Sequence, residues 1–425
     1  MPSQQQVLDV LQESCRVLQQ PSARRGRPAQ VSWARLCMGM VLGVLQGWGA
    51  QLDLWRWVSF ESWGPFAPVR VSDQAISNRL ERAEPFFHQL FEQVSAWLRP
   101  LVESWQDRTL APFARDVFAL DESTLDQVGR FLPWLRGVPS GKQELLAGRI
   151  SALFDVRRQQ WVRLEVLKEA KANCKNVAVA MLDGLHPGTL LLFDRGSLGF
   201  ALFDELSERG LWWISRYANA VSFQVSHVCD QSDGVLDAIV YLGVHRADQA
   251  RHPVRLLQFW HAGKHSRYLT NVLDPNSLPL DMVARLYARR WDIELAFRLL
   301  KDVLRLNQLW SAKWAVIQLQ VWACLLIAQV FHALQVQIAG QAGVEVFEVS
   351  LDLLVRLVPQ WLQRGLSPIE QAMRFGRDLG LIRPSTRHQV EVPWIDPAWV
   401  IPPPAWAIQP RVKVRHRPPK KKPAG

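Results

Sequence analysis

Cysteine is scarce in this sequence: five cysteines are scattered over 425 residues, in odd number and without a CxxC pair. They are Cys15, Cys37, Cys174, Cys229 and Cys324. This scatter argues against a disulfide framework and against a zinc site, and it predicts a reducing compartment. The ten histidines show no metal-ligand spacing either. No basic segment followed by an apolar one opens the chain, so we expect no secretory signal.

Long, purely apolar runs are also missing. Residues 36–52 contain four glycines, two glutamines and a tryptophan, and residues 314–338 are broken by five glutamines and a histidine. A membrane-spanning helix needs about 20 residues with little polarity. Both segments therefore predict buried helices of a folded protein, and we expect no membrane partner.

Positive charge is what the sequence has in excess. The net charge is +11, and seven of the positive residues lie between Arg411 and Lys422, which leaves +4 for the rest of the chain. A positive surface attracts phosphate backbones and gains from counterion release, so nucleic acid is a natural partner. On charge alone, a solvated basic end explains the tail equally well.

The order of segments predicts an α/β protein of two or three units. Residues 1–110 are expected to form a helical region that could bind DNA. In it, Ser72 could cap a helix that exposes Gln74, Asn78 and Arg79 for a DNA groove, although a packing helix is the simpler interpretation. Three strands, a helix, a strand, a helix and a strand are expected between 117 and 217, followed by a β-rich stretch over 218–280. A helix over 281–306, a helical region over 311–400 and a basic disordered tail over 401–425 complete the prediction.

Two aspartates follow apolar runs that are typical of buried strands. Asp121 follows VFAL and Asp194 follows LLLF. Acids at the ends of neighbouring strands can hold hard cations, because the sheet fixes their positions while the loops beyond stay open. Turn formation and helix capping are the ordinary uses of such aspartates.

A more specific pattern lies in YARRWDIELAFRLLK. Tyr287, Arg290, Glu294 and Lys301 are spaced by three, four and seven residues. At about 100° per residue they fall at roughly 0°, 300°, 340° and 320°, so one stripe of a helix would carry all four. An amphipathic helix with an internal Arg290–Glu294 ion pair is the simpler alternative.

This spacing resembles that of bacterial DDE transposases of the insertion-sequence-4 type. Their Tyr-x2-Arg-x3-Glu-x6-Lys signature is filled by the same four residues, and their first two catalytic acids are similar to Asp121 in ALDEST and Asp194 in LLFDRGS. The resemblance covers roughly residues 110–310. It implies a ribonuclease-H-like mixed sheet, formed by 111–217 and 281–310, with the β-rich insertion at 218–280.

The resemblance also implies the chemistry. Asp121, Asp194 and Glu294 would be the catalytic residues and would bind two Mg²⁺ or Mn²⁺ ions. Tyr287, Arg290 and Lys301 would grip phosphates of double-stranded DNA, both inverted terminal repeats and target. Trp291 would stack on a flipped base, or would simply pack. A homodimer on DNA and a bacterial cytoplasmic location, at the nucleoid when DNA is bound, follow from the same resemblance.

Other acids compete for these roles. Asp155, which ends SALFD, is the best substitute for a misassigned member, and Asp121 is preferred to Asp116 because it stands at the expected end of its strand. The remaining rivals are Glu122, Asp126, Asp292 and Asp302. A related nuclease that cuts without joining, and a DNA-binding protein without catalysis, are the alternative functions.

Overall fold

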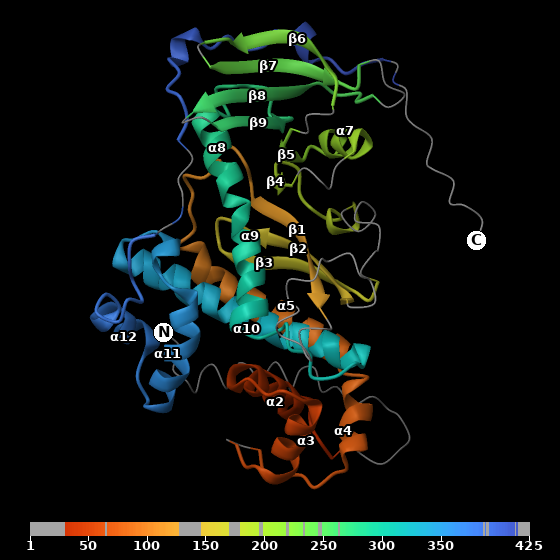
Figure 1. The fold of residues 1–425 in the computed structure, drawn as a ribbon, viewed down its shortest axis with the longest axis vertical. Helices are drawn as coiled ribbons and strands as arrows, with labels where there is room; N and C mark the ends of the chain where they lie inside the picture. The colour runs from red at the N-terminus through yellow and green to blue at the C-terminus, as the bar shows by residue number, and fades with distance from the viewer. Residues whose placement is uncertain are drawn as a thin grey trace, which may run out of the picture.

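The computed structural model describes residues 30–63, 66–126, 146–169, 179–194, 199–217, 221–232, 234–244, 249–261, 264–385, 387, 391–412 and 414. Residues 176–178, which begin the short helix expected after the third strand, and residues 413 and 415–425 of the basic tail lie outside these residues. Helices α2 to α4 lie at one end of the molecule and strands β6 to β9 at the other (Figure 1). Between them, long helices cross the central strands (Figure 1).

Nine strands of the described residues form one sheet, in the order β3-β2-β1-β4-β5-β9-β8-β7-β6. Strands β1, β2 and β3 are antiparallel neighbours, whereas β4 and β5 run parallel to β1. The strands are β1 (Val117–Asp126), β2 (Leu146–Asp155), β3 (Gln160–Leu167), β4 (Leu190–Phe193), β5 (Trp212–Arg216), β6 (Phe223–Asp230), β7 (Val235–Leu242), β8 (Val254–His261) and β9 (Lys264–Thr270). The mixed α/β fold predicted from the sequence is confirmed.

The four strands expected between 218 and 280 are present as β6 to β9, and they pair antiparallel with one another. They do not form a sheet of their own, because β9 pairs antiparallel with β5 and so continues the central sheet. This junction places the tip of the β8–β9 hairpin at the same edge of the sheet as the carboxyl end of β5.

Side chains alternate between two apolar layers. On β1, Val117 and Ala119 belong to the larger core, while Phe118 and Leu120 belong to the smaller one. The smaller core lies under α7 (Phe200–Glu208). The larger core lies under α5 (Glu84–Glu103), α8 (Leu280–Arg289), α9 (Trp291–Arg298) and α10 (Trp314–Ala342). Because successive residues of a strand face opposite ways, this division tells which layer each polar residue of β1 and β4 faces.

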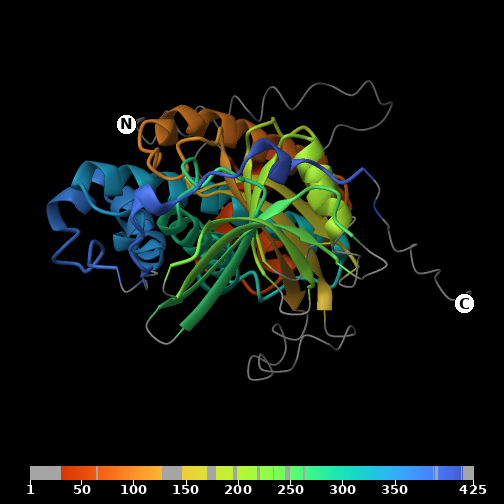
Figure 2. The same cartoon turned by 90° about the horizontal axis from the view of Figure 1, so that it is seen from above.

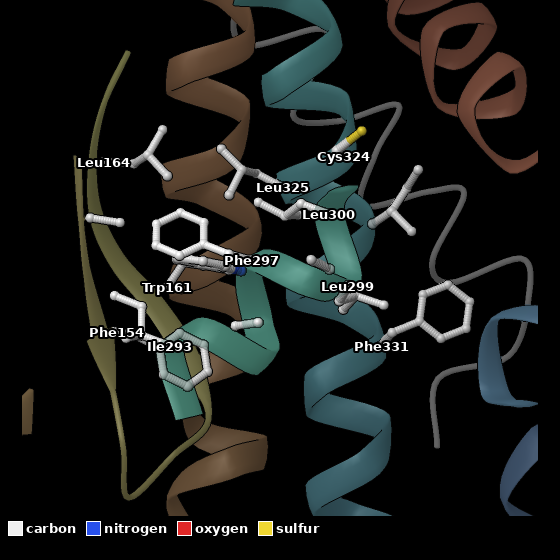
Figure 3. Packing of buried hydrophobic residues seen from close by; sticks show 14 of the residues in the cluster. Phe154, Trp161, Leu164, Ile293, Phe297, Leu299, Leu300, Cys324, Leu325 and Phe331 are labelled. Carbon is white, nitrogen blue, oxygen red and sulfur yellow. The ribbon is translucent and has the colours of Figure 1, made fainter. Parts of the chain in front are cut away.

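The larger core is densest where α9 and α10 meet β2 and β3. The Trp161 ring packs against two phenyl rings. Its centroid lies 5.1 Å from that of Phe154 and 5.2 Å from that of Phe297. Figure 3 shows these rings from the strands and from α9 pointing toward one another, with Leu325 of α10 beside them. This contact fixes α9 on the sheet.

Helix α10 has 29 residues and is apolar all round, as expected of a helix buried on every side. Among the described helices it alone is long and apolar enough to span a membrane, yet 78% of its most apolar stretch is buried inside the fold. Its polar side chains bond inward: Gln329 accepts from the Trp161 amide and donates to Ser95. The prediction of a buried helix at 314–338 is confirmed.

The N-terminal helices are α2 (Trp33–Gln46), α3 (Gln51–Phe60) and α4 (Asp73–Leu80). Ser72 caps α4 by accepting from the Ala75 amide, as predicted. Gln74 and Asn78 are exposed, but the Arg79 guanidinium lies 3.7 Å from the centre of the Trp33 ring, where it packs against the helical bundle. Insertion of α4 into a DNA groove stays a prediction, and Gln74 and Asn78, rather than Arg79, are the residues exposed for such a contact.

The C-terminal region contains α11 (Leu351–Gln363), α12 (Pro368–Phe375) and an extended segment. The tail expected to be disordered from 401 is instead ordered as far as Arg411. The amide of Ile401 donates to Cys229 of β6, and the amide of Arg411 donates to the Arg251 carbonyl. Figure 2 shows this segment in blue, running past the green strands. The reason is that β6 is an edge strand with unpaired backbone groups, and the segment covers it.

Candidate active site

Asp121 and Asp194 lie at equivalent positions on neighbouring strands. The parallel register of β1 and β4 ends at the pair Leu120–Phe193, and each aspartate is the next residue. By alternation both face the layer that α8 and α9 cover, the side of Ala119 and Leu192. The sequence analysis expected Asp121 to end its strand, which is wrong: β1 continues to Asp126 by pairing with β2 alone. Asp121 instead lies just beyond the point where the neighbouring strand β4 ends. The β4 side of Asp121 is therefore not covered by a paired strand, as it would be at the end of β1.

The helix expected over 281–306 is interrupted. Helix α8 ends at Arg289, α9 begins at Trp291, and residues Leu299–Val303 form a π-helical turn. Arg290 lies at the junction, and its amide reaches only to the Tyr287 carbonyl, three residues back. A π-turn has more residues per turn than an α-helix, so the angles calculated for a regular helix do not apply unchanged at Lys301, and its place in the site stays a prediction.

Arg290 links the two sides of the site. Its Nη2 atom lies 2.7 Å from Oε1 of Glu294, and its Nη1 atom lies 3.5 Å from Oδ2 of Asp121. The Arg290 side chain is 5% exposed, whereas the carboxylates are partly open, at 25% for Asp121 and 34% for Glu294. One buried guanidinium therefore holds a strand carboxylate and a helix carboxylate on the same face of the sheet.

The pKa of Asp121 is raised to about 6, mainly by burial and in smaller part by the charges of Glu294 and Asp194. The Glu122 amide, which donates to Asp121 at 2.8 Å, and the Arg290 guanidinium oppose this shift. The three acids are thus close enough to feel one another's charge. The structure places these acids near enough for Glu294 and Asp194 to influence the pKa of Asp121.

These side chains suit a hard divalent cation in chemistry, because all three offer carboxylate oxygens and their mutual repulsion is relieved by positive charge. Within the described ranges, no three acidic, histidine or cysteine side chains lie close enough together to enclose an ion. Instead, the positive charge of Arg290 partly neutralises the negative charges of Asp121 and Glu294. Binding of Mg²⁺ or Mn²⁺ by Asp121, Asp194 and Glu294 therefore stays a prediction.

The other signature residues surround this cluster. Tyr287 is 4% exposed, and burial raises the pKa of its phenol to about 12. Trp291 is 54% exposed, and the Arg290 guanidinium lies 5.2 Å from the centre of its ring. Lys301 is half-buried in the π-turn. Tyr287 and Trp291 are therefore direct neighbours of Arg290.

Arg216 was missed by the sequence analysis. It is the last residue of β5, the third parallel strand, and its alternation with Ile214 aims it at the same layer as the two aspartates. The guanidinium is exposed and lies 5.7 Å from the centre of the Tyr287 ring, the same distance as Arg290. The sequence does contain a signal for Arg216, because LWWISR is an apolar strand that ends in a charged residue, as the strands before Asp121 and Asp194 were expected to do.

Four of the rival acids have structural partners. Asp155 is buried and accepts from the Arg157 and Arg158 amides, and Asp116 pairs with Arg158 at the opposite end of β1. Glu122 pairs with Arg149 across β2. Asp292 is fully buried between Arg289 and Arg387, on the side of the helix away from Glu294 as expected. None of these rivals replaces a member of the cluster.

Comparison with known proteins finds a family to which more than half of the chain is similar. The family described as transposase DDE domain matches residues 112–330, which include the cluster and both flanking helices. No curated protein matches the chain. Among solved structures, the chain is similar to the piggyBac transposase in its synaptic complex with hairpin DNA, with 11% identity, a TM-score of 0.43, and coverage of 92% of this chain and 85% of that one.

Proposed function

Since the chain belongs to the transposase DDE domain family, we propose that it cuts and joins DNA strands at insertion-sequence ends, as a transposase of the insertion-sequence-4 type. One observation carries this finer assignment. Asp121 and Asp194 follow the last registered pair of two parallel strands, and Arg290 ties Asp121 to Glu294 on the helix above that face. Three acids far apart in the sequence thus form one electrostatic unit.

In this proposal Asp121, Asp194 and Glu294 bind two Mg²⁺ or Mn²⁺ ions. Such ions, when bound, activate the attacking oxygen and stabilise the leaving one. Arg290 and Arg216 suit a DNA phosphate, because a guanidinium offers a planar fork of donors, and Lys301 suits it as a point charge. Tyr287 packs beside both arginines and positions them. The exposed ring of Trp291 suits stacking on an unpaired base.

The same proposal assigns the units of the chain. Residues 111–217 and 281–310 form a ribonuclease-H-like catalytic core, and 218–280 are an insertion that lengthens its sheet. Residues 1–110 are assigned to DNA recognition, and 311–400 support the core through α10. Two copies of the chain would pair inverted terminal ends, at the nucleoid of a bacterial cell.

Incubation of the purified chain with DNA tests this function. The substrate is a supercoiled plasmid that carries the DNA flanking the coding region, where inverted repeats are expected. We expect strand breaks in Mg²⁺ or Mn²⁺ and none in EDTA, followed by joining of the freed 3′ ends to target DNA. Hydrolysis without joining would favour a nuclease, and binding without strand breaks would favour a protein without catalysis. Either result contradicts the proposed transposase.

A further inference from the structure

We propose that Arg290 is the counter-cation of the carboxylate site while no DNA is bound, and that a DNA phosphate releases the site by taking over its guanidinium. Asp121 and Glu294 would then become open to a divalent cation only on a DNA complex. This inference rests on the proposed function, since it assumes that these carboxylates bind the metal.

The contacts place Arg290 where a competing cation has to go. Its two terminal nitrogens lie 2.7 Å and 3.5 Å from oxygens of Glu294 and Asp121, so both carboxylates share one positive charge. A guanidinium and a divalent ion on the same oxygens would repel each other in a partly buried site, where charges are weakly screened. Binding of one therefore weakens binding of the other.

The surroundings of Arg290 let it change partners. The Nε atom of Arg290 is buried without a hydrogen-bond partner in the described part of the chain. Arg290 also lies at the junction of α8 and α9, and its guanidinium is 5.2 Å from the half-exposed Trp291 ring. The buried guanidinium thus has an exposed ring as a direct neighbour.

Arg216 gives an incoming phosphate a first contact. Its guanidinium is exposed at the end of β5 and shares the Tyr287 ring with Arg290. A phosphate drawn there by charge would meet Arg290 next. Once Arg290 turns toward it, Asp121 and Glu294 lose their shared counter-charge and their affinity for a divalent cation rises. The consequence is a thermodynamic coupling: DNA tightens metal binding, and metal tightens DNA binding by the same factor.

Manganese binding to the full chain measures this coupling without any cutting reaction. Free Mn²⁺ is titrated by electron paramagnetic resonance, with and without a duplex from the flanking DNA. Asp194→Asn with the same duplex corrects for manganese held by the DNA itself. We expect Arg290→Gln to bind Mn²⁺ about tenfold more tightly than the unchanged chain in the absence of DNA, a factor equal to about 1.4 kcal/mol. DNA should tighten Mn²⁺ binding of the unchanged chain by a similar factor and leave Arg290→Gln unaffected.

Arg298→Gln is the matched control, because it removes the same charge from an exposed position on α9. It should bind Mn²⁺ as the unchanged chain does. Unaltered Mn²⁺ affinity in Arg290→Gln would overturn the inference, as would an affinity of the unchanged chain that DNA does not alter. If Arg290→Gln does not fold, the two titrations of the unchanged chain decide alone. A chain that cuts DNA but lacks the coupling refutes only the role of Arg290, whereas a chain that neither binds Mn²⁺ nor cuts refutes the proposed function.

Discussion

Replacing Asp121 by Asn is expected to make the protein more stable and inactive at once. Burial holds the pKa of Asp121 at about 6 in the folded chain, above its usual value of 3.8. Above pH 6 the ionised carboxylate therefore destabilises the fold, by about 1–3 kcal/mol for a shift of this size. Asparagine removes that charge and keeps an oxygen for the Glu122 amide. A gain in stability on loss of a catalytic group is typical of a strained active site.

The sign of the pH dependence follows from the same shift. Below pH 3.8 both states hold the proton, so Asp121→Asn and the unchanged chain should be equally stable. Between pH 3.8 and 6 the unfolded chain ionises first, so the unchanged chain loses stability as the pH rises, and above pH 6 the difference is constant. Urea denaturation at pH 4 and pH 7 measures it, with Glu122→Gln as the neighbouring control. A destabilised Asp121→Asn at pH 7 would show that Asp121 is a structural partner of Arg290.

Phe297→Ala is expected to destabilise the fold and to loosen the packing of α9 on the sheet. Phe297 is 5% exposed, lies against the Trp161 ring, and follows Glu294 by one turn on α9. Loss of a buried phenyl ring costs about 3–5 kcal/mol, because the cavity does not close completely. Since α9 would then be held less firmly on the sheet, cutting should fall as well as stability.

Denaturant midpoints compare Phe297→Ala with Phe297→Leu, which keeps most of the volume and should cost less than about 1.5 kcal/mol. If this packing positions Glu294, Phe297→Ala should lose more cutting activity than Phe297→Leu, in the same order as their loss of stability. Full cutting activity in a Phe297→Ala chain that is destabilised would mean that α9 is positioned by other contacts, such as Arg289 with Asp292.

The parts of the fold with a clear period could be predicted from the sequence. Buried strands such as LLLF and a capped helix after Ser72 are encoded by neighbouring residues, so their types follow from local pattern. The end of β1 could not be predicted, because Asp121 to Asp126 are kept in the strand by the partner β2, twenty or more residues away in the chain. The ordered segment at 401–411 has the same explanation, since its partners are on β6, β7 and the residues around Arg251.

The sequence singled out the site residues, but the electrostatic contacts among them could not be predicted. Spacing paired Arg290 with Glu294, and the apolar runs before Asp121 and Asp194, together with the family resemblance, selected these two acids. That Arg290 also reaches Asp121 depends on the break between α8 and α9, and no residue in that stretch is a glycine or proline that would mark a break. The π-turn after Arg298 is likewise unmarked, so the irregular backbone around Lys301 could not be predicted from the sequence.

In the proposed metal-dependent DNA-cutting site, Glu294 acts together with Asp121 and Asp194. The most direct measurement compares plasmid cutting in Mg²⁺ by Glu294→Gln and by Asp302→Asn, an exposed acid two turns further along the chain. We expect Glu294→Gln to cut at least about 10³-fold more slowly, because losing a metal ligand forfeits several kcal/mol of transition-state stabilisation, and Asp302→Asn to cut normally. Equal cutting by the two variants would contradict the account.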